Sequence, residues 1–170
     1  TFKAIHFLFF NPYVKASKRR DFTINALMMD VLTGEILDFF GGKEDLANGV
    51  IRHIDDTSFV EDPLRVLRAA QFAARFNFCI SEETKNLCKN ISLNSLSKER
   101  IFGETEKALL KAEKPSVFFK ELRNMDQLEV WFPEVGSLIG VPQNKNHHKE
   151  GDVWNHTMLV LDEAAKRRAE

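Results

Sequence analysis

The sequence predicts an α+β fold in which helices predominate, and three observations support this prediction. The first is a stretch of β-type signals between residues 22 and 40, and the second is a series of helical patterns from Asp62 onward. The third is composition, because 44% of the 170 residues are hydrophobic and 29% are charged, which is typical of a globular protein with a real core. The two halves of the chain are therefore expected to differ in kind.

The β-type signals are two apolar runs, at residues 24–29 and 36–40, with a Thr-Gly turn at residues 33–34 between them. This order predicts a β-hairpin, which the two glycines at 41–42 end. Residues 7–10 are also apolar and strand-like. Because the chain opens inside that apolar stretch without an initiator Met, we expect it to be a piece of a longer protein.

The predicted helices each begin at a start signal made of Ser, Pro or acidic residues. Residues 136–151, rich in Gly, Pro, Asn and His, are typical of a linker, and residues 152–170 are expected to form one further helix. The apolar stripe of that helix is predicted at Leu159, Val160 and Ala164. The start signals are Asp62-Pro63, Ser81-Glu82-Glu83, Ser97-Lys98-Glu99 and Pro115.

Composition also limits the classes of function. The formal net charge is -1, so nucleic-acid binding would depend on local basic clusters. No apolar run approaches the roughly 18 to 20 residues that span a bilayer, and the opening residues lack the features of a signal peptide. Cys79 and Cys88 have no CxxC spacing and are expected to be buried free thiols. A reducing, cytoplasmic location without a membrane partner is the expectation.

A basic cluster at residues 15–20 carries four positive charges and leads directly into Asp21. Arginine presents a planar fork that matches phosphate oxygens, so this cluster is a candidate site for a polyphosphate. The alternative is a solvated loop. Asp21 and Asn25 favour the binding site, because a carboxylate and an amide beside Arg20 suit a ribose hydroxyl and a phosphate.

The segment at residues 61–75 predicts a helix with two contrasting faces. At about 100° per residue, its arginines and Phe72 fall within an arc of roughly 80°, opposite Val, Leu and Ala residues. Such a face can hold a nucleotide. In the alternative, Asp62 before Pro63 is a helix N-cap, and the arginines pair with Glu61 and Asp62. The residues on the polar face are Arg65, Arg68, Phe72 and Arg75.

Four segments together resemble the motifs of one family, the bacterial-type (class II) tRNA nucleotidyltransferases, which comprise CCA-adding enzymes and poly(A) polymerases. Residues 19–27 resemble its RRDFTxNAL motif, and residues 38–52 are similar to its flexible hinge segment. Residues 61–65 resemble its nucleotide-selecting EDxxR motif, and residues 99–104 its helix-stabilising motif. The resemblance covers essentially residues 7–165, with all four motifs in the family's order.

The resemblance implies a division into three parts. Residues 1–50 would be the end of a nucleotidyltransferase palm that includes the hairpin, and residues 51–145 a helical neck for base recognition and RNA binding. Residues 146–170 would begin an HD-type helical domain. The implied reaction extends a tRNA 3′ end from CTP and ATP, or from ATP alone in a poly(A) polymerase. A rival hypothesis is a non-catalytic helical module that binds RNA phosphates without base preference.

The resemblance also implies how nucleotide is bound. Asp62 would accept a hydrogen bond from the amino group of C or A, while Arg65 donates to the adjacent ring nitrogen. G and U would be rejected because their donors and acceptors are reversed. Arg20 would contact the triphosphate and Asp21 a ribose hydroxyl. The implied nucleotide-binding residues are Arg20, Asp21, Asn25, Asp62, Arg65 and Arg68.

The sequence departs from the family pattern in its catalytic carboxylates. Catalysis there needs Mg²⁺ held by an Asp-x-Asp pair, and no Asp-x-Asp occurs in these 170 residues. The pair is expected upstream of Thr1, so the chain alone is expected to have no catalytic residue, no metal site and no activity. The adjacent Asp55 and Asp56 are expected to lie in a solvated turn.

Residues 147–158 resemble the entry to an HD-type phosphohydrolase domain, in which His156 would join a later His-Asp doublet on a metal. No such doublet is present. His156 is therefore expected to be an ordinary core or surface residue. A fragment of an HD phosphohydrolase remains a weaker rival hypothesis.

Overall fold

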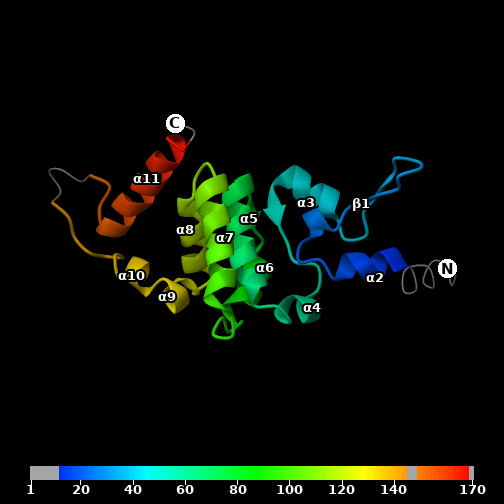
Figure 1. Cartoon of the computed structure of the whole chain (residues 1–170), viewed down its shortest axis with the longest axis horizontal. Helices are drawn as coiled ribbons and strands as arrows, with labels where there is room; N and C mark the ends of the chain where they lie inside the picture. Colours follow the sequence, from blue (N-terminus) through cyan, green and yellow to red (C-terminus); the bar gives the residue numbers. More distant parts are fainter. Residues whose placement is uncertain (1–11, 145–148, 169–170) are drawn as a thin grey trace.

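The structure is a computed structural model that describes residues 12–144 and 149–168. Its elements follow one another along an elongated molecule, with the N-terminal segments and hairpin at one end and the last helix at the other (Figure 1). The strand-like residues 7–10 lie outside the described residues. The elements are α2 (Pro12–Lys18), η1 (Thr23–Asn25), β1 (Met28–Met29), β2 (Ile36–Leu37), α3 (Gly42–Asn48), β3 (Val50–Ile51), α4 (Asp56–Val60), α5 (Leu64–Phe76), β4 (Cys79–Ile80), α6 (Glu82–Lys89), α7 (Lys98–Lys111), α8 (Ser116–Asn124), α9 (Leu128–Trp131), α10 (Pro133–Gly136) and α11 (Val153–Lys166).

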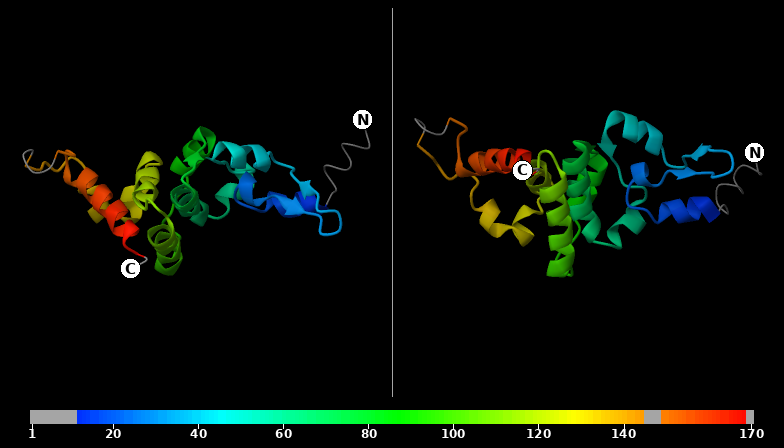
Figure 2. Two further views of the ribbon diagram at one scale, coloured as in Figure 1. Left: turned by 90° about the horizontal axis from the view of Figure 1, so that it is seen from above. Right: turned by 45° about the horizontal axis from the view of Figure 1, so that its top comes forward.

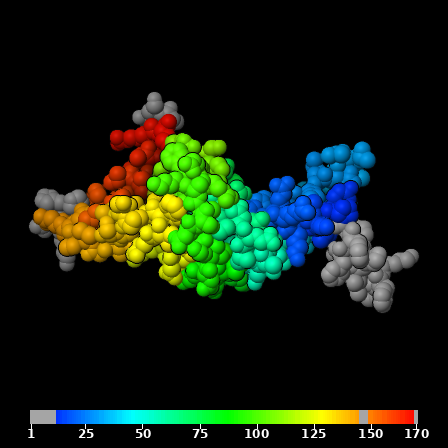
Figure 3. All heavy atoms as spheres, turned by 60° about the horizontal axis from the view of Figure 1, so that its bottom comes forward, coloured from blue at the N-terminus to red at the C-terminus, as the bar shows by residue number. Residues whose placement is uncertain are grey.

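The predicted hairpin is confirmed, but its strands are short. β1 pairs antiparallel with β2, with Met28 opposite Leu37, and the Asp30 carboxylate accepts hydrogen bonds from backbone N–H groups inside the turn. The run at residues 24–29 is not a strand throughout, because η1 occupies its start. The Asn25 side chain accepts a hydrogen bond from the Phe22 N–H, which holds this segment in a tight turn. Figure 3 shows this part as an arm that projects from the thicker helical centre.

Helix α3 begins in close contact with η1. A Cβ at Gly42 would collide with the Thr23 carbonyl group, so only glycine permits this approach. Asp38 caps the helix, since its carboxylate accepts hydrogen bonds from the N–H groups of Gly42 and Lys43. Burial alone would raise the pKa of Asp38, but backbone hydrogen bonds, including those from Lys43, Gly42 and Phe40, hold it below its usual value.

The predicted helix starts at Ser81, Ser97 and Pro115 are confirmed. Ser81 and Ser97 are N-caps whose hydroxyl groups accept hydrogen bonds from backbone N–H groups in the first turn. Helix α8 begins directly after Pro115. At the start of α5 the Asp62 carboxylate accepts the Leu64 N–H at 3.1 Å. The sequence patterns missed α2, α3 and α4, all of which precede Asp62.

The core is built around α5, which packs against α7 and α8 (Figure 1). Its packing face matches the predicted one, since the small and branched side chains opposite the arginines are buried. Alanines on this face allow close approach, and each larger side chain buried here contributes roughly 1.5 to 3 kcal/mol. A short parallel pair, β3 with β4, joins residues before α5 to residues after it. The buried residues on this face of α5 are Val66, Leu67, Ala69, Ala70, Ala73 and Ala74.

The predicted apolar stripe of α11 is wrong. Leu159 and Val160 are 53% and 50% exposed, and Ala164 is exposed too. The buried side chains are Trp154 and Met158, which lie one turn apart on the opposite face. Apolar residues occur on both faces of this helix, so the choice of face is made by its packing against α8, beside which it lies in both views of Figure 2.

The prediction for the cysteines is half wrong. Both thiols are free, but Cys79 is exposed whereas Cys88 is fully buried. Side chains alternate along a strand, so Ile80 in β4 faces the core and its neighbour Cys79 faces outward. Within residues 12–144 and 149–168, no helix is both long enough and apolar enough to span a bilayer.

Candidate nucleotide site between η1 and α5

An aromatic contact attaches the N-terminal arm to helix α5. Phe22 is fully buried, and its ring lies edge-on to Phe59 in α4 and to Phe72 in α5, with centroid distances of 5.9 and 5.5 Å. The backbone of Phe22 also forms an antiparallel bridge with His53. These contacts place the RRDFTxNAL-like segment directly against the arginine face of α5.

Three predicted nucleotide-binding residues meet at this junction. The Asp21 carboxylate, 6% exposed, accepts hydrogen bonds from Arg68 Nε at 2.5 Å and from Asn25 Nδ2 at 2.7 Å. The Arg68 guanidinium also lies over the Phe72 ring, 5.2 Å from its centroid. Arg68 and Asp21 are 47 residues apart in the sequence. The structure therefore brings Asp21, Asn25 and Arg68 together.

Asp62 lies apart from that cluster and is held by a different arginine. Its two carboxylate oxygens accept from Arg100 Nη2 at 2.9 and 3.1 Å, and one of them also accepts the Leu64 N–H. The sequence alternative, in which Asp62 pairs with Arg65 or Arg68, is not what forms. Arg100 belongs to the segment at residues 99–104, so the helix-stabilising motif directly contacts the nucleotide-selecting motif.

Arg65 and Arg20 differ in how far the fold constrains them. The Arg65 guanidinium donates to the backbone carbonyls of Ser58 at 2.5 Å and Arg19 at 3.1 Å, which joins α5 to the end of the basic cluster. Arg20 is exposed, and its side chain makes no hydrogen bond or ion pair within the part of the chain that the structure describes. It follows Arg19 at the edge of the junction.

Two buried carboxylates that support the junction were not predicted. Glu104 in α7, 3% exposed, has one oxygen 3.9 Å from Arg68 Nη1 and 2.8 Å from Lys107 Nζ, while its other oxygen is buried without a partner among the described residues. Asp45 in α3 accepts from Thr23 Oγ1 at 2.6 Å and from Arg52 Nε. Both lie in segments that resemble family motifs, which is the signal that pointed to their neighbourhood.

The adjacent Asp55 and Asp56 have structural roles at the start of α4. Asp55 caps α4, and its pKa is lowered, first by the hydrogen bond from the Ser58 N–H and then by the bond from Lys18. Asp56 accepts from His53 Nε2 at 2.6 Å, depending on the tautomer. In residues 12–144 and 149–168, no three His, Cys, Asp or Glu side chains group as metal ligands.

His156, the residue singled out for an HD-type metal site, lies in the first turn of α11. Its Nδ1 is 2.6 Å from the Glu150 carboxylate, so it is engaged in an ion pair or hydrogen bond. His147 and His148, the start of the HD-like segment, lie outside the described residues.

Comparisons with protein families match the η1 side of the junction and the region that follows α5, and α5 itself (Leu64–Phe76) lies between the two matched ranges. Residues 12–52 match the model of the poly A polymerase head domain, and residues 77–138 match the model described as a probable RNA and SrmB-binding site of polymerase A. The two matches follow one another along the chain, and both models describe parts of poly A polymerases. The chain belongs to the tRNA nucleotidyltransferase and poly(A) polymerase family.

Individual relatives are CCA-adding enzymes. The multifunctional CCA protein of Haemophilus ducreyi is 47% identical over 165 residues, which cover 91% of this chain and 40% of the relative. Solved structures of a CCA-adding enzyme with ATP and with CTP are 34% and 36% identical, with TM-scores of 0.64 and 0.66. They cover 80% and 75% of this chain, and in each case 32% of the solved chain.

A further structure, the Thermotoga maritima CCA-adding enzyme complexed with tRNA, is 34% identical with a TM-score of 0.65. The match covers 81% of this chain and 34% of that enzyme. The chain thus spans about two fifths of the length of the curated relatives it matches.

Proposed function

We propose that this chain is part of a template-independent RNA nucleotidyltransferase that adds CCA, or part of it, to tRNA 3′ ends from CTP and ATP. The observation that carries the proposal is the cluster of Asp21, Asn25 and Arg68, because three residues expected to bind nucleotide meet between η1 and α5 beside the basic segment. The proposal includes a cytoplasmic location and the division at residues 1–50, 51–145 and 146–170.

In this proposal, the cluster binds the sugar and phosphates of the nucleotide. Asp21 is an ionisable acceptor suited to a ribose hydroxyl, and without nucleotide it is neutralised by Arg68. Arg68 uses Nε for Asp21 and has Nη1 3.9 Å from the Glu104 carboxylate, so the remaining N–H groups of its guanidinium can donate to a phosphate. Arg20, exposed at the rim, adds a positive charge for the triphosphate.

Base selection falls to Asp62 and Arg65. Arg100 holds the Asp62 carboxylate in one orientation, and Ser58 and Arg19 do the same for the Arg65 guanidinium. A fixed acceptor beside a fixed donor matches the edge of C or A. U or G would leave these groups unmatched beneath the bound base, a loss of about 1 to 3 kcal/mol per group.

The family implies Mg²⁺, which stabilises the charge that develops on the phosphates during transfer. The described residues do not fit a magnesium site, since they contain no group of three carboxylate or imidazole ligands. We therefore assign no residue of this chain to the metal. The chain's own residues are assigned to binding and selecting the nucleotide.

The test is nucleotide selectivity of binding, measured by titrating the protein with CTP, ATP, UTP and GTP in a calorimeter. We expect CTP and ATP to bind more tightly than UTP and GTP. Asp62→Asn keeps the helix cap, because Asn caps about as well as Asp, but adds an NH₂ donor that can face the carbonyl of U. Its discrimination against UTP should fall, while the melting temperature barely moves.

The matched control is Asp126→Asn, an exposed carboxylate at a positive φ of 56° that Asn tolerates well. It should leave nucleotide selectivity unchanged. Strict rejection of UTP by Asp62→Asn would make Asp62 a cap alone and overturn the base-reading role. Binding of ATP alone would indicate a poly(A) polymerase, and RNA binding without nucleotide binding would indicate a non-catalytic module.

A further inference from the structure

Helix α5 holds the end of the basic cluster on both sides of Arg20. Arg65 donates from Nη2 to the backbone carbonyl of Arg19 at 3.1 Å. Arg68 donates from Nε to the Asp21 carboxylate at 2.5 Å. Because the two arginines are three residues apart in α5, they are neighbours on one face of the helix. They therefore attach the residue before Arg20 and the residue after it to the same helix.

The position of Arg20 itself depends on these attachments. Its side chain is exposed and makes no hydrogen bond or ion pair within residues 12–144 and 149–168. Its backbone N–H donates to the Ser17 carbonyl at 2.9 Å, which ends the turn that follows α2. A cationic side chain can be directed at a ligand only if the backbone that carries it is held. The contacts of the two neighbouring residues therefore decide where the Arg20 charge lies.

The second partner of Arg65 belongs to the same arrangement. Arg65 Nη1 donates to the Ser58 carbonyl at 2.5 Å, and the Ser58 hydroxyl donates to the Lys18 carbonyl at 3.4 Å. Lys18 also forms an ion pair with Asp55 at 2.9 Å, but its side chain is 53% exposed. An exposed ion pair contributes little. The two charge-assisted hydrogen bonds of Arg65 are therefore the stronger attachment of the cluster to α4 and α5.

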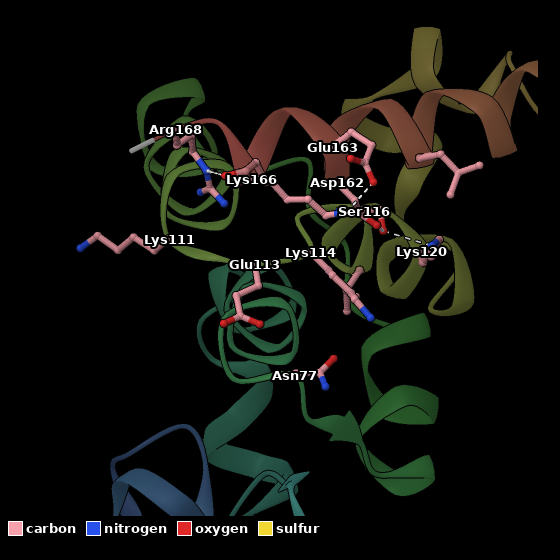
Figure 4. A pocket seen from close by; sticks show the side chains of 13 residues that line it. Asn77, Lys111, Glu113, Lys114, Ser116, Lys120, Asp162, Glu163, Lys166 and Arg168 are labelled. Atoms are coloured by element: carbon pink, nitrogen blue, oxygen red, sulfur yellow. Dashed lines mark hydrogen bonds and ion pairs between the residues drawn. The ribbon is translucent and has the colours of Figure 1, made fainter. Parts of the chain in front are cut away.

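Another guanidinium in the molecule bonds two carbonyls, but with a different result. Arg168, just beyond α11, donates from Nη1 and Nη2 to the carbonyls of Leu109 and Ala112 at the end of α7 (Figure 4). Those carbonyls belong to one helix end, where the last C=O groups lack partners inside the helix. The two carbonyls bound by Arg65 lie 7 and 46 residues away in the sequence. Arg168 completes a helix end, whereas Arg65 joins separate segments.

The guanidinium of Arg65 can hold these segments and still contact a base. It has five N–H donors, of which one on Nη1 and one on Nη2 are used. Nε and one N–H on each outer nitrogen remain. Lysine could not do both, because its ammonium is a single point of charge without the planar fork. Base reading and support of the cluster are therefore compatible in one arginine.

We propose that Arg65 is a positioning residue for the triphosphate. It holds the backbone of Arg19 and thereby keeps Arg20 beside Asp21 at the edge of the candidate nucleotide site. This inference rests on the proposed function, in which Arg20 contacts the triphosphate and Arg65 contacts the base. It adds that the same arginine acts on the phosphates through Arg20, so that base reading and phosphate binding share one side chain.

The experiment uses a ligand without a base. Inorganic tripolyphosphate has the three linked phosphates of a nucleotide, and its binding to the protein is measured by calorimetry. Arg65→Lys keeps the positive charge but loses the fork that bonds two carbonyls. We expect it to bind tripolyphosphate roughly 3- to 10-fold more weakly than the wild-type protein. If Arg65 only reads bases, its affinity for tripolyphosphate stays at the wild-type value, and the inference is overturned.

The matched control is Arg168→Lys, which removes the same pair of carbonyl contacts at the other end of the molecule. It should bind tripolyphosphate with the wild-type affinity. An equal loss in both variants would overturn the inference, because the effect would then follow from any such loss of stability. Melting temperatures of both variants show that they are folded. Arg65→Gln is measured in parallel as a second variant and should also weaken binding.

A double-mutant cycle tests whether Arg65 acts through Arg20. Arg20→Ala should itself weaken tripolyphosphate binding, because it removes the cation assigned to the phosphates. In that background, Arg65→Lys should cause little further loss, since the side chain that it positions is gone. Additive losses would show that Arg65 acts on the phosphates by another route, and would overturn the positioning role. A purely structural role of Arg65 would not depend on Arg20.

Titration of the same samples with CTP, ATP, UTP and GTP separates this inference from the proposed function. If the wild-type protein prefers CTP and ATP but Arg65→Lys binds tripolyphosphate normally, the positioning role is wrong and the proposed function stands. If all four nucleotides bind equally but the Arg20-dependent loss is found, Arg65 positions the cluster and base selection fails. A wild-type protein that binds no tripolyphosphate would overturn the inference, because Arg20 would then contact no triphosphate.

Discussion

At two junctions of the molecule, an aspartate carboxylate in one segment accepts hydrogen bonds from another segment. At the η1–α5 junction, Asp21 reaches Arg68 and is 6% exposed. At the α8–α11 junction, Asp162 accepts from the Ser116 N–H at 3.0 Å and from its hydroxyl at 2.7 Å, and is only half-buried. The first pairs a charge with a charge, whereas the second caps the beginning of a helix.

The difference between these partners shows what each junction can do. A backbone N–H at a helix start can bind one acceptor, so Asp162 completes α8 and attaches α11 to it. A guanidinium has five N–H donors in a fork, so Arg68 retains donors after it has bound Asp21. The η1–α5 junction can therefore exchange part of its pairing for a ligand, while the α8–α11 junction is complete without one.

The two junctions also differ in the surroundings of their buried aromatic residues, Phe22 and Trp154. Phe22 is fully enclosed by aromatic rings from two helices, whereas Trp154 at the other junction is buried but lies under the exposed Arg123, 5.4 Å from its guanidinium. The apolar contact between the arm and the helical centre is thus centred on the Phe22 ring. Loss of that ring should have the largest effect of any change considered below.

The first prediction breaks the η1–α5 junction at this anchor. Phe22→Ala should lower the free energy of unfolding by about 3 to 5 kcal/mol, because it removes a fully buried aromatic side chain and leaves a cavity. Urea unfolding followed by circular dichroism measures it. Phe102→Ala is the control, since Phe102 is 65% exposed, and it should change stability by less than about 0.5 kcal/mol. Equal effects would mean that Phe22 does not anchor the arm.

The second prediction tests whether Asp21 and Arg68 act as a pair. Arg68→Met leaves a buried carboxylate without its cation and should lower stability by about 1 to 3 kcal/mol. Adding Asp21→Asn should restore part of that stability, because the uncompensated charge is then gone. A double-mutant cycle of urea denaturation provides the coupling energy. Additive effects would show that the pair contributes no interaction of its own.

The third prediction applies the same logic to the α8–α11 junction. Asp162→Ala removes the cap of α8 and should lower stability by about 1 kcal/mol. Asp162→Asn retains an acceptor and should have a smaller effect, in contrast to Asp21, whose charge has a charged partner. Thermal unfolding of both variants checks it. A larger destabilisation by Asn than by Ala would contradict the capping role.

The features that the sequence could predict depend on contacts between residues close together in the chain, and those it could not predict depend on contacts between distant residues. Helix starts at Ser81 and Ser97 are encoded locally, since the cap and the N–H groups it binds lie three residues apart. The arginine face of α5 follows from periodicity. The pairing of Asp62 with Arg100 joins residues 38 positions apart, and no local pattern carries that information. The resemblance to a family gave only the order of those two motifs along the chain.

The misses have physical reasons of the same kind. α3 and α4 have only seven and five residues, so they show too little periodicity to be recognised, although Asp55 caps α4 at the Ser58 N–H three residues on. α11 has apolar residues on both sides, so periodicity could not distinguish the face of Leu159 from that of Met158. The exposure of Cys79 was missed because β4 has only two residues, which is too short for alternation to be visible in the sequence.

The last prediction has the smallest effect on stability and tests the packing beside α5. Burial raises the pKa of the Cys88 thiol from its ordinary value of 9.0 to about 12, because a thiolate is poorly solvated in the core. The folded state therefore keeps this proton at pH values where the unfolded chain loses it. Cys88 thus favours folding fully below pH 9, and that contribution is lost as pH rises toward 12.

Iodoacetamide labelling at pH 8, followed by mass spectrometry, distinguishes the two thiols. One equivalent should react quickly, at the exposed Cys79, and Cys88 should react only after denaturant is added, because alkylation needs both access and thiolate. Cys79→Ser should abolish the fast reaction and leave the melting temperature unchanged. In Phe22→Ala, protection of Cys88 should persist, because Cys88 belongs to the helical centre and not to the arm. Loss of that protection would show that the two regions unfold as one unit.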